Sequence, residues 1–141
     1  MTARYRLTVA YDGTNFEGWQ CQPSKRSIQD ILIISFKRVF KHDLWLLGAS
    51  RTDAGVHAIG QVALCKFNSL LLPVDHLLRV WNISLPPQIK ILDAIAVDSE
   101  FHPHKNVVSK TYVYKIFLNK PMPFESSFGW YYPLVRKIDF S

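Results

Sequence analysis

Residues 4–11 alternate between apolar and mostly polar side chains, and this pattern constrains the fold more strongly than any other feature of the sequence. Tyr5, Leu7, Val9 and Tyr11 fall on one face of an extended chain, whereas two arginines and a threonine fall on the other. A strand with one apolar face and one wet face is typical of an antiparallel sheet that is covered on one side. We therefore expect a layered α/β fold in which the helices pack on one face of the sheet.

Capping and spacing signals predict the remaining elements. Ser27 and Asp30 form a capping-box pattern before apolar residues at helical spacing, which predicts a helix over 27–40. The other expected elements are strands over 44–49, 61–67, 89–97 and 111–117, a second helix over 73–81, and loops over 50–58 and 119–133. The resulting order, βαββαββ, predicts an α+β sandwich with a mostly antiparallel mixed sheet.

The composition indicates a globular domain with an excess of positive charge. The chain has 141 residues, of which 48% are hydrophobic and 20% are charged, and its formal net charge is +6. This charge favours a polyanionic partner such as nucleic acid. The apolar stretches fall far short of the roughly 20 residues that cross a bilayer, and residues 1–11 lack the apolar core of a secretory signal. We expect a cytoplasmic protein without a membrane span, in which Cys21 and Cys65 are buried or incidental thiols.

The segment 50–58 combines a cation, a carboxylate and a glycine in a loop that directly follows a predicted buried strand. Proteins often present reactive groups on such loops. A guanidinium beside a carboxylate favours its charged form, so Arg51 would make Asp53 a nucleophile or a hydrogen-bond acceptor. The alternative is that residues 51–53 simply build an Asx-type turn with a surface ion pair. Residue types alone leave both interpretations open.

Eight consecutive residues, Arg51 to Ala58, match the sequence R-T-D-A-G-V-H-A, which is a signature of the TruA family of tRNA pseudouridine synthases. The resemblance continues on both sides of this segment, in the family's order and at close to its spacing. The further matching residues are Tyr11–Thr14, Phe16, Gly18–Gln20, Gln22–Pro23, Gln61–Val62, Asn82, Leu85–Pro86, Phe101–His102, Thr111–Tyr112 and Tyr114. The chain therefore resembles the N-terminal part of that family.

The resemblance implies isomerisation of uridine to pseudouridine at positions thirty-eight to forty of the tRNA anticodon arm, without a cofactor. Asp53 would be the nucleophile, and attack on C1′, addition to C6 and formation of a glycal all remain open as routes. The resemblance also implies that Arg51 pairs with Asp53 and holds the target base out of the stem, while Tyr112 stacks on the flipped uracil. The alternative for Tyr112 is a core position on a strand, and we assign the neighbouring Tyr114 to the core.

Three histidines have possible chemical roles. His57 could be a proton shuttle or part of the loop's structure, and the structural role is favoured because Asp53 already supplies the reactive group. His102 and His104 form an H-x-H pattern, but no matching set of further ligands accompanies them, so we expect no metal site. Asp12 is expected to build a turn with Gly13.

The sequence departs from the family in two respects. His104 and Lys105 stand where the family commonly has an arginine and an aromatic residue, which implies altered tRNA contacts, and Ser50 replaces a common glycine. Family members also continue well beyond the last residue of this chain, and 135–140 resembles the lead into their second half. In the family, two similar halves share one sheet, a second basic residue reaches the aspartate from the other half, and homodimers are usual.

Residues 1–141 are therefore expected to form the N-terminal, ferredoxin-like or RRM-like half of a catalytic domain that acts on tRNA and is inactive alone. The competing hypothesis is a non-catalytic RNA-binding module that uses the same sheet and basic surface. A carboxylate at Asp53 argues against that module, because its charge would oppose contacts to phosphates. A metal-dependent hydrolase that uses Asp53 and the histidines lacks sufficient ligands.

Overall fold

The computed structural model describes residues 2–68, 70, 72–134, 137 and 139. The chain divides into two compact units, Met1–Val107 and Val108–Ser141, and each is described by itself. Among the described residues, no helix combines the length and the apolar character that crossing a bilayer requires. The segment 135–140, which resembles the lead into a second half, lies largely outside the described residues.

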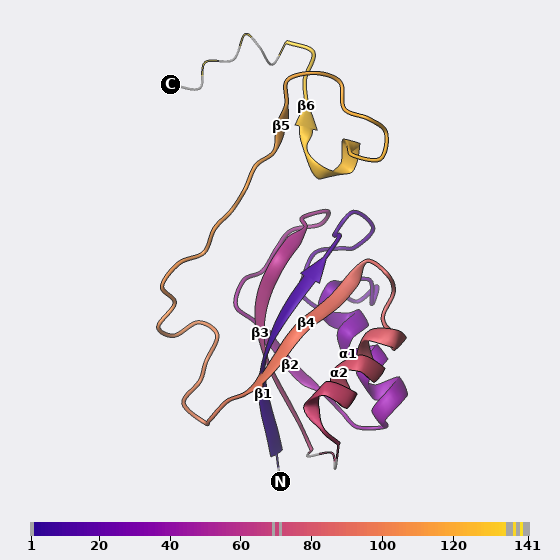
Figure 1. Ribbon diagram of the computed structural model, residues 1–141, viewed down its shortest axis with the longest axis vertical. Coiled ribbons are helices and arrows are strands. Elements are labelled where there is room, and N and C mark those ends of the chain that lie inside the picture. Colours follow the sequence, from indigo (N-terminus) through magenta and orange to yellow (C-terminus); the bar gives the residue numbers. More distant parts are fainter. Residues whose placement is uncertain (1, 69, 71, 135–136, 138, 140–141) are drawn as a thin grey trace. The chain divides into compact units, whose positions relative to one another are not determined.

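The first unit is a four-stranded antiparallel sheet with two helices (Figure 1). Its strands occur in the spatial order β2-β3-β1-β4, which with the chain order βαββαβ is the ferredoxin-like topology. The elements are β1 (Thr2–Tyr11), α1 (Ile28–Phe40), β2 (Trp45–Gly48), β3 (Ala58–Asn68), α2 (Val74–Ser84) and β4 (Ile89–Ala96). The predicted α+β sandwich is confirmed for this unit.

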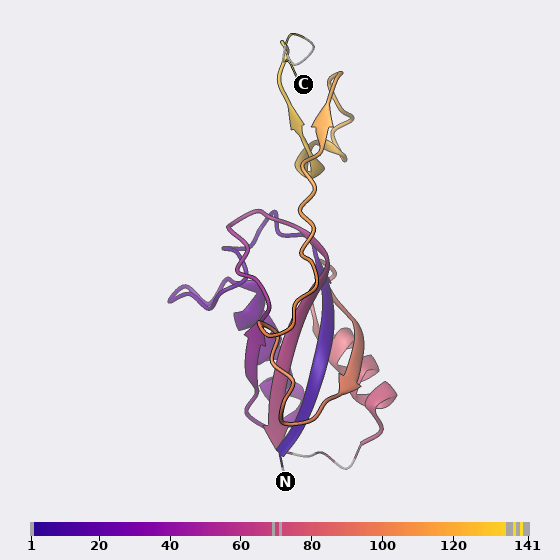
Figure 2. The same ribbon diagram turned by 90° about the vertical axis from the view of Figure 1, so that its left-hand side faces the viewer.

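The helices cover one face of the sheet, as the alternation in β1 predicts. Leu7, Val9 and Tyr11 are buried in the core between the sheet and the helices. Figure 2 shows the other face, which residues 97–104 of the same unit cross after β4. The guanidinium of Arg4 ties this segment to the sheet by donating to the backbone carbonyls of Asp98, Ser99 and Phe101.

The two helices pack through the apolar stripes that their spacing predicts. In α1, the Ser27 hydroxyl accepts a hydrogen bond from the amide of Asp30 at 3.0 Å, which satisfies a donor of the first turn. Phe36 lies in the core between the two helices, where it makes an edge contact with Trp81 of α2. The indole of Trp81 also donates to the hydroxyl of Ser35 at 3.0 Å, so this buried polar pair is satisfied.

Strand β3 begins three residues earlier than predicted. Ala58 pairs with Tyr11 of β1, although Ile59 and Gly60 remain exposed and show no buried alternation. The register between β1 and β3 shifts between Val9 and Tyr11, so the pairing resumes at Ala58 beyond an irregularity. Pairing of this kind does not depend on a buried side chain. Because β2 ends at Gly48, the loop between the two strands spans residues 49–57, one position earlier than predicted, and we call it the β2–β3 loop.

The second unit contains only short elements in its described residues. Strands β5 (Ile116–Phe117) and β6 (Trp130–Tyr131) pair in parallel, and a 3-10 helix η1 spans Ser126–Phe128. The strand predicted over 111–117 is therefore limited to its last two residues. The assignment of Tyr114 to the core is wrong, because its side chain is 88% exposed. Within the described part of this unit, no sheet covers residues 111–114, so their apolar side chains have no layer against which to pack.

Candidate active site

The β2–β3 loop begins from a rigid base at the end of β2. Gly48 is the last residue of that strand, and a Cβ atom at this position would collide with the indole of Trp19. Trp19 is itself only 1% exposed, so its ring cannot move aside easily. The amide of Ala49 then donates to the carbonyl of Val62 at 2.7 Å, which extends the pairing of the sheet into the loop.

The segment 12–19, which follows β1, holds the loop on the N-terminal side of Asp53. The hydroxyls of Tyr11 and Thr52 are hydrogen-bonded at 2.8 Å, and the amide of Trp19 donates to the carbonyl of Thr52 at 3.0 Å. Gly18 has a φ of +78°, and a Cβ there would collide with the same carbonyl. A glycine is therefore required for this close approach of the two backbones.

The same segment holds the loop on the C-terminal side of Asp53. Nδ1 of His57 lies 3.0 Å from the amide nitrogen of Gly13 and 3.0 Å from Oδ1 of Asp12. A Cβ atom at Gly13 would collide with the carbonyl of Val56, so the two backbones also touch at this point. Segment 12–19 thus contacts the loop on both sides of the candidate nucleophile.

The N-terminus of α1 in turn fixes segment 12–19. The amides of Ile28 and Gln29 donate to the carbonyls of Gly18 and Trp19, each at 3.0 Å. Asp30 accepts from the amide of Gln22 at 2.9 Å. Burial opposes the ionisation of Asp30, but the hydrogen bonds from Gln22 and Ser27 outweigh it and hold the pKa of Asp30 below its ordinary value.

Asp53 and Arg51 lie on this braced loop with exposed side chains. The backbone carbonyl of Asp53 accepts from the amide of Val56 at 3.2 Å, and Gly55 takes a φ of +80° in the resulting turn. Within the described residues, neither side chain forms a hydrogen bond or salt bridge, so the structure does not show the ion pair between them that the resemblance implies. The alternative of an Asx turn is not observed either, because the turn uses the main chain. The Asp53 carboxylate is thus not used to hold the loop together.

The third predicted site residue, Tyr112, belongs to the second unit. Its side chain is 61% exposed, so the alternative of a core position is not what the structure shows. Arg51 and Asp53 therefore lie on one loop of the first unit, whereas Tyr112 belongs to the second unit.

The other candidate residues have structural partners. Asp12 accepts from the hydroxyl of Thr14 at 2.6 Å and from its amide at 3.0 Å, as expected for a turn. These bonds, led by that of the hydroxyl, together with His57 lower the pKa of Asp12. Nε2 of His104 lies 2.8 Å from the carbonyl oxygen of Gly48, at the base of the loop. Sequence reasoning missed this contact, because nothing in the local pattern links a residue after β4 to the end of β2.

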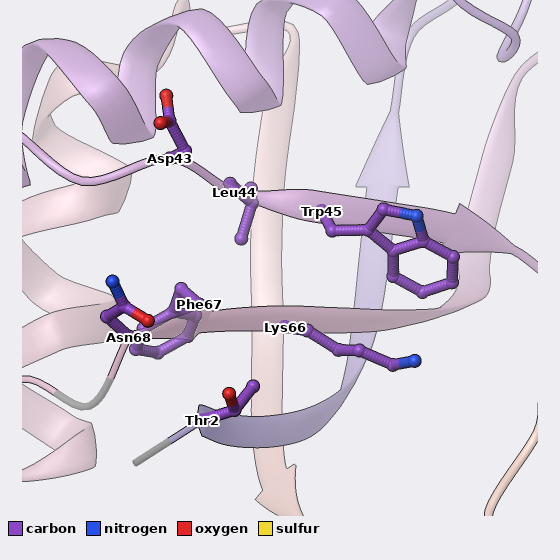
Figure 3. Close-up of a pocket in the computed structure, with 7 residues that line it drawn as sticks. All are labelled: Thr2, Asp43, Leu44, Trp45, Lys66, Phe67 and Asn68. Carbon is purple, nitrogen blue, oxygen red and sulfur yellow. The ribbon is translucent and has the colours of Figure 1, made fainter.

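A separate hollow lies at the opposite end of β2 and β3 from the loop (Figure 3). Its lining residues are Thr2, Asp43, Leu44, Trp45, Lys66, Phe67 and Asn68. The ammonium of Lys66 stands 4.4 Å from the ring centroid of Trp45 within it. The carboxylate in this hollow, Asp43, is paired with Lys37 at 2.7 Å. The candidate active site is therefore the braced loop and not this hollow.

The fold and the site together define a ferredoxin-like α/β sandwich of basic composition. Its braced loop between two strands displays a carboxylate that has no bonding partner in the part of the chain that the structure describes. A family model described as tRNA pseudouridine synthase matches residues 7–104, which include the whole loop. The chain belongs to the tRNA pseudouridine synthase family.

Several relatives are similar over nearly the whole chain. A tRNA pseudouridine synthase A from Thermodesulfovibrio yellowstonii is 39% identical over 137 residues, which cover 96% of this chain and 53% of the relative. The corresponding protein from Solibacter usitatus is 41% identical over 131 residues, or 92% and 54% of the two chains. A third, from Protochlamydia amoebophila, is 42% identical over 140 residues, or 96% and 52%. The chain thus spans about half the length of the curated relatives it matches.

Proposed function

We propose that this chain forms the N-terminal half of a catalytic domain that isomerises uridine to pseudouridine in tRNA, with Asp53 as the nucleophile. The observation that carries the proposal is the β2–β3 loop, which holds the first seven of the eight signature residues and exposes the Asp53 carboxylate without a structural partner among the described residues. The proposed targets are the uridines at positions thirty-eight to forty of the anticodon arm.

The chemistry requires one reactive carboxylate and no redox partner. The N1–C1′ bond of uridine breaks, the uracil turns, and a C5–C1′ bond forms, while C5 loses a proton and N1 gains one. The atoms of substrate and product are the same, so we propose that no cofactor takes part. A carboxylate can stabilise the separated sugar covalently or take a proton from it, and Asp53 is the group we assign to this step.

Arg51 and Tyr112 are proposed to hold the flipped base. A paired base leaves its stack at a cost of a few kcal/mol, which protein contacts have to offset. The exposed guanidinium of Arg51 forms no salt bridge within the described residues, so it is available to RNA phosphates or to the base. The exposed ring of Tyr112 offers a surface on which the uracil can stack.

The complete site is proposed to need a second half. Because the chain spans about half of its relatives' length, the opposite wall of the cleft and a second basic residue would come from the remainder. Assembly as a homodimer on one tRNA is part of the same proposal. The net charge of +6 is consistent with a polyanionic substrate.

The test is an active chimera. Residues 1–141 are joined to the C-terminal half of the Thermodesulfovibrio yellowstonii relative, and pseudouridine formation is measured on unmodified tRNA by tritium release. We expect Asp53→Asn to abolish turnover and leave tRNA affinity nearly unchanged, because the amide keeps the shape and is not a nucleophile. Asp75→Asn, at an exposed position of α2, is the matched control and should remain active.

Two outcomes would contradict the proposal. Substantial turnover by the Asp53→Asn chimera would remove Asp53 from the chemistry. An inactive wild-type chimera that still binds tRNA would favour the alternative, a non-catalytic RNA-binding module. Residues 1–141 alone are expected to bind tRNA weakly and to show no turnover, and activity within about tenfold of the chimera would show that the second half is dispensable.

A further inference from the structure

The position of the Asp53 carboxylate depends on the anchors of its loop, because the side chain has no bond of its own within the described residues. On the N-terminal side, Thr52 is held through both its hydroxyl and its carbonyl. On the C-terminal side, the amide of Gly55 donates to the carbonyl of Phe16 only at the long distance of 3.3 Å. A second anchor is therefore needed to fix the C-terminal side, and His57 is the side chain placed to supply it.

The ring of His57 can bind segment 12–19 in either protonation state. When Nδ1 carries no proton, its lone pair accepts from the amide of Gly13 at 3.0 Å. When Nδ1 carries a proton, it donates to Oδ1 of Asp12, also at 3.0 Å. The two hydrogen bonds from Thr14 hold that carboxylate in place. Nδ1 therefore has one hydrogen-bond partner in segment 12–19 with its proton and another without it.

We propose that His57 is a positioning residue, which fixes the C-terminal side of the β2–β3 loop against Asp12 and Gly13 and thereby sets where the Asp53 carboxylate stands. Burial supports this role, because only 28% of the His57 side chain is exposed. Asp53, in contrast, is an exposed residue. The consequence for catalysis rests on the proposed function. A displacement of the nucleophile by about 1 Å costs on the order of a hundredfold in rate.

The first test does not require activity and uses residues 1–141 as they stand. Amide hydrogen exchange is measured at Gly55 and Val56, with the amide of Trp19 as an internal reference on the opposite anchor. We expect His57→Ala to accelerate exchange at both loop amides by about tenfold or more through local opening. The matched control, His76→Ala on the exposed face of α2, should change neither. Unchanged loop exchange in His57→Ala would overturn the proposal whether or not the protein is a synthase.

The second test separates positioning from proton transfer in the active chimera. His57→Ala should lower kcat by about a hundredfold with KM changed by less than about threefold. His57→Asn should restore most of this loss, because the amide places a donor and an acceptor where Nδ1 stands. The shape of the pH profile should be the same in His57→Ala as in the wild type, because a residue that only positions the loop transfers no proton.

Other kinetic results would overturn the proposal. A loss that Asn does not restore, together with a changed pH profile, would assign the imidazole to proton transfer. A rise in KM at constant kcat would make His57 an RNA contact.

Discussion

Gly18 and Gly55 form a matched pair of positions that tests how the loop is braced. Their φ angles are +78° and +80°, so alanine strains the backbone to a similar degree at either position. Their surroundings differ, because a Cβ at Gly18 would collide with the carbonyl of Thr52, whereas nothing lies within 4 Å of a Cβ at Gly55. The difference between the two alanine variants therefore measures the close contact and not the backbone strain.

The structure sets the expected magnitudes. Gly55→Ala should lower the free energy of unfolding by about 1 to 2 kcal/mol through left-handed strain alone. Gly18→Ala carries the same strain and also displaces the Thr52 carbonyl, which accepts the amide of Trp19. Trp19 is buried, and a buried donor without an acceptor costs about 1 to 3 kcal/mol more. The total expected for Gly18→Ala is about 2 to 5 kcal/mol.

Thermal unfolding of residues 1–141, followed by tryptophan fluorescence, measures this difference. Trp19 and Trp81 are both buried in the first unit, so their emission reports its unfolding. Each kcal/mol lowers Tm by about 4 to 8 °C in a unit of this size, so Gly18→Ala should melt at least about 4 °C below Gly55→Ala. Equal melting temperatures would contradict this prediction, because they would show that the contact between Gly18 and Thr52 contributes nothing to stability.

Three further predictions follow from the charged groups. The pKa of Asp30 is lower in the folded state than in the unfolded chain, so its ionised carboxylate stabilises the fold. This contribution should be full above about pH 4 and be lost as the pH falls through the lowered pKa. Asp30→Asn should therefore reduce the loss of stability at acid pH, measured by urea unfolding over a series of pH values. Arg51→Ala should reduce kcat/KM of the chimera by about tenfold or more by removing a charge-assisted contact to RNA, whereas Arg79→Ala on α2 should not, and equal effects would contradict a specific role. The affinity of the chimera for tRNA should fall steeply between about 50 and 200 mM salt, and a flat response in filter binding would exclude extensive phosphate contacts.

Local sequence patterns predicted the elements whose cause is local. The alternation over 4–11 predicted β1 correctly. Successive side chains of a strand point to opposite faces, so alternating apolar residues lie together on one face. The pair of Ser27 and Asp30 marked the start of α1, because that cap satisfies donors within a single turn. Neither inference required knowledge of distant residues. The strand predicted over 111–117 was mostly wrong, because a strand also needs a neighbouring strand with which to pair. Only Ile116 and Phe117 have such a partner in the described structure.

The amino-acid sequence was sufficient to predict the family, the ferredoxin-like order of the elements in the first unit, and the loop that carries the candidate nucleophile. How that loop is held could be seen only in the folded structure. The contacts of Thr52 with Tyr11 and of His57 with Asp12 join residues about forty positions apart, and no local pattern predicts such distances. The tertiary structure also decided a short-range question, because Arg51 and Asp53 are only two positions apart and yet form no ion pair within the described residues. Backbone direction and packing set where a side chain points, and these depend on the whole unit.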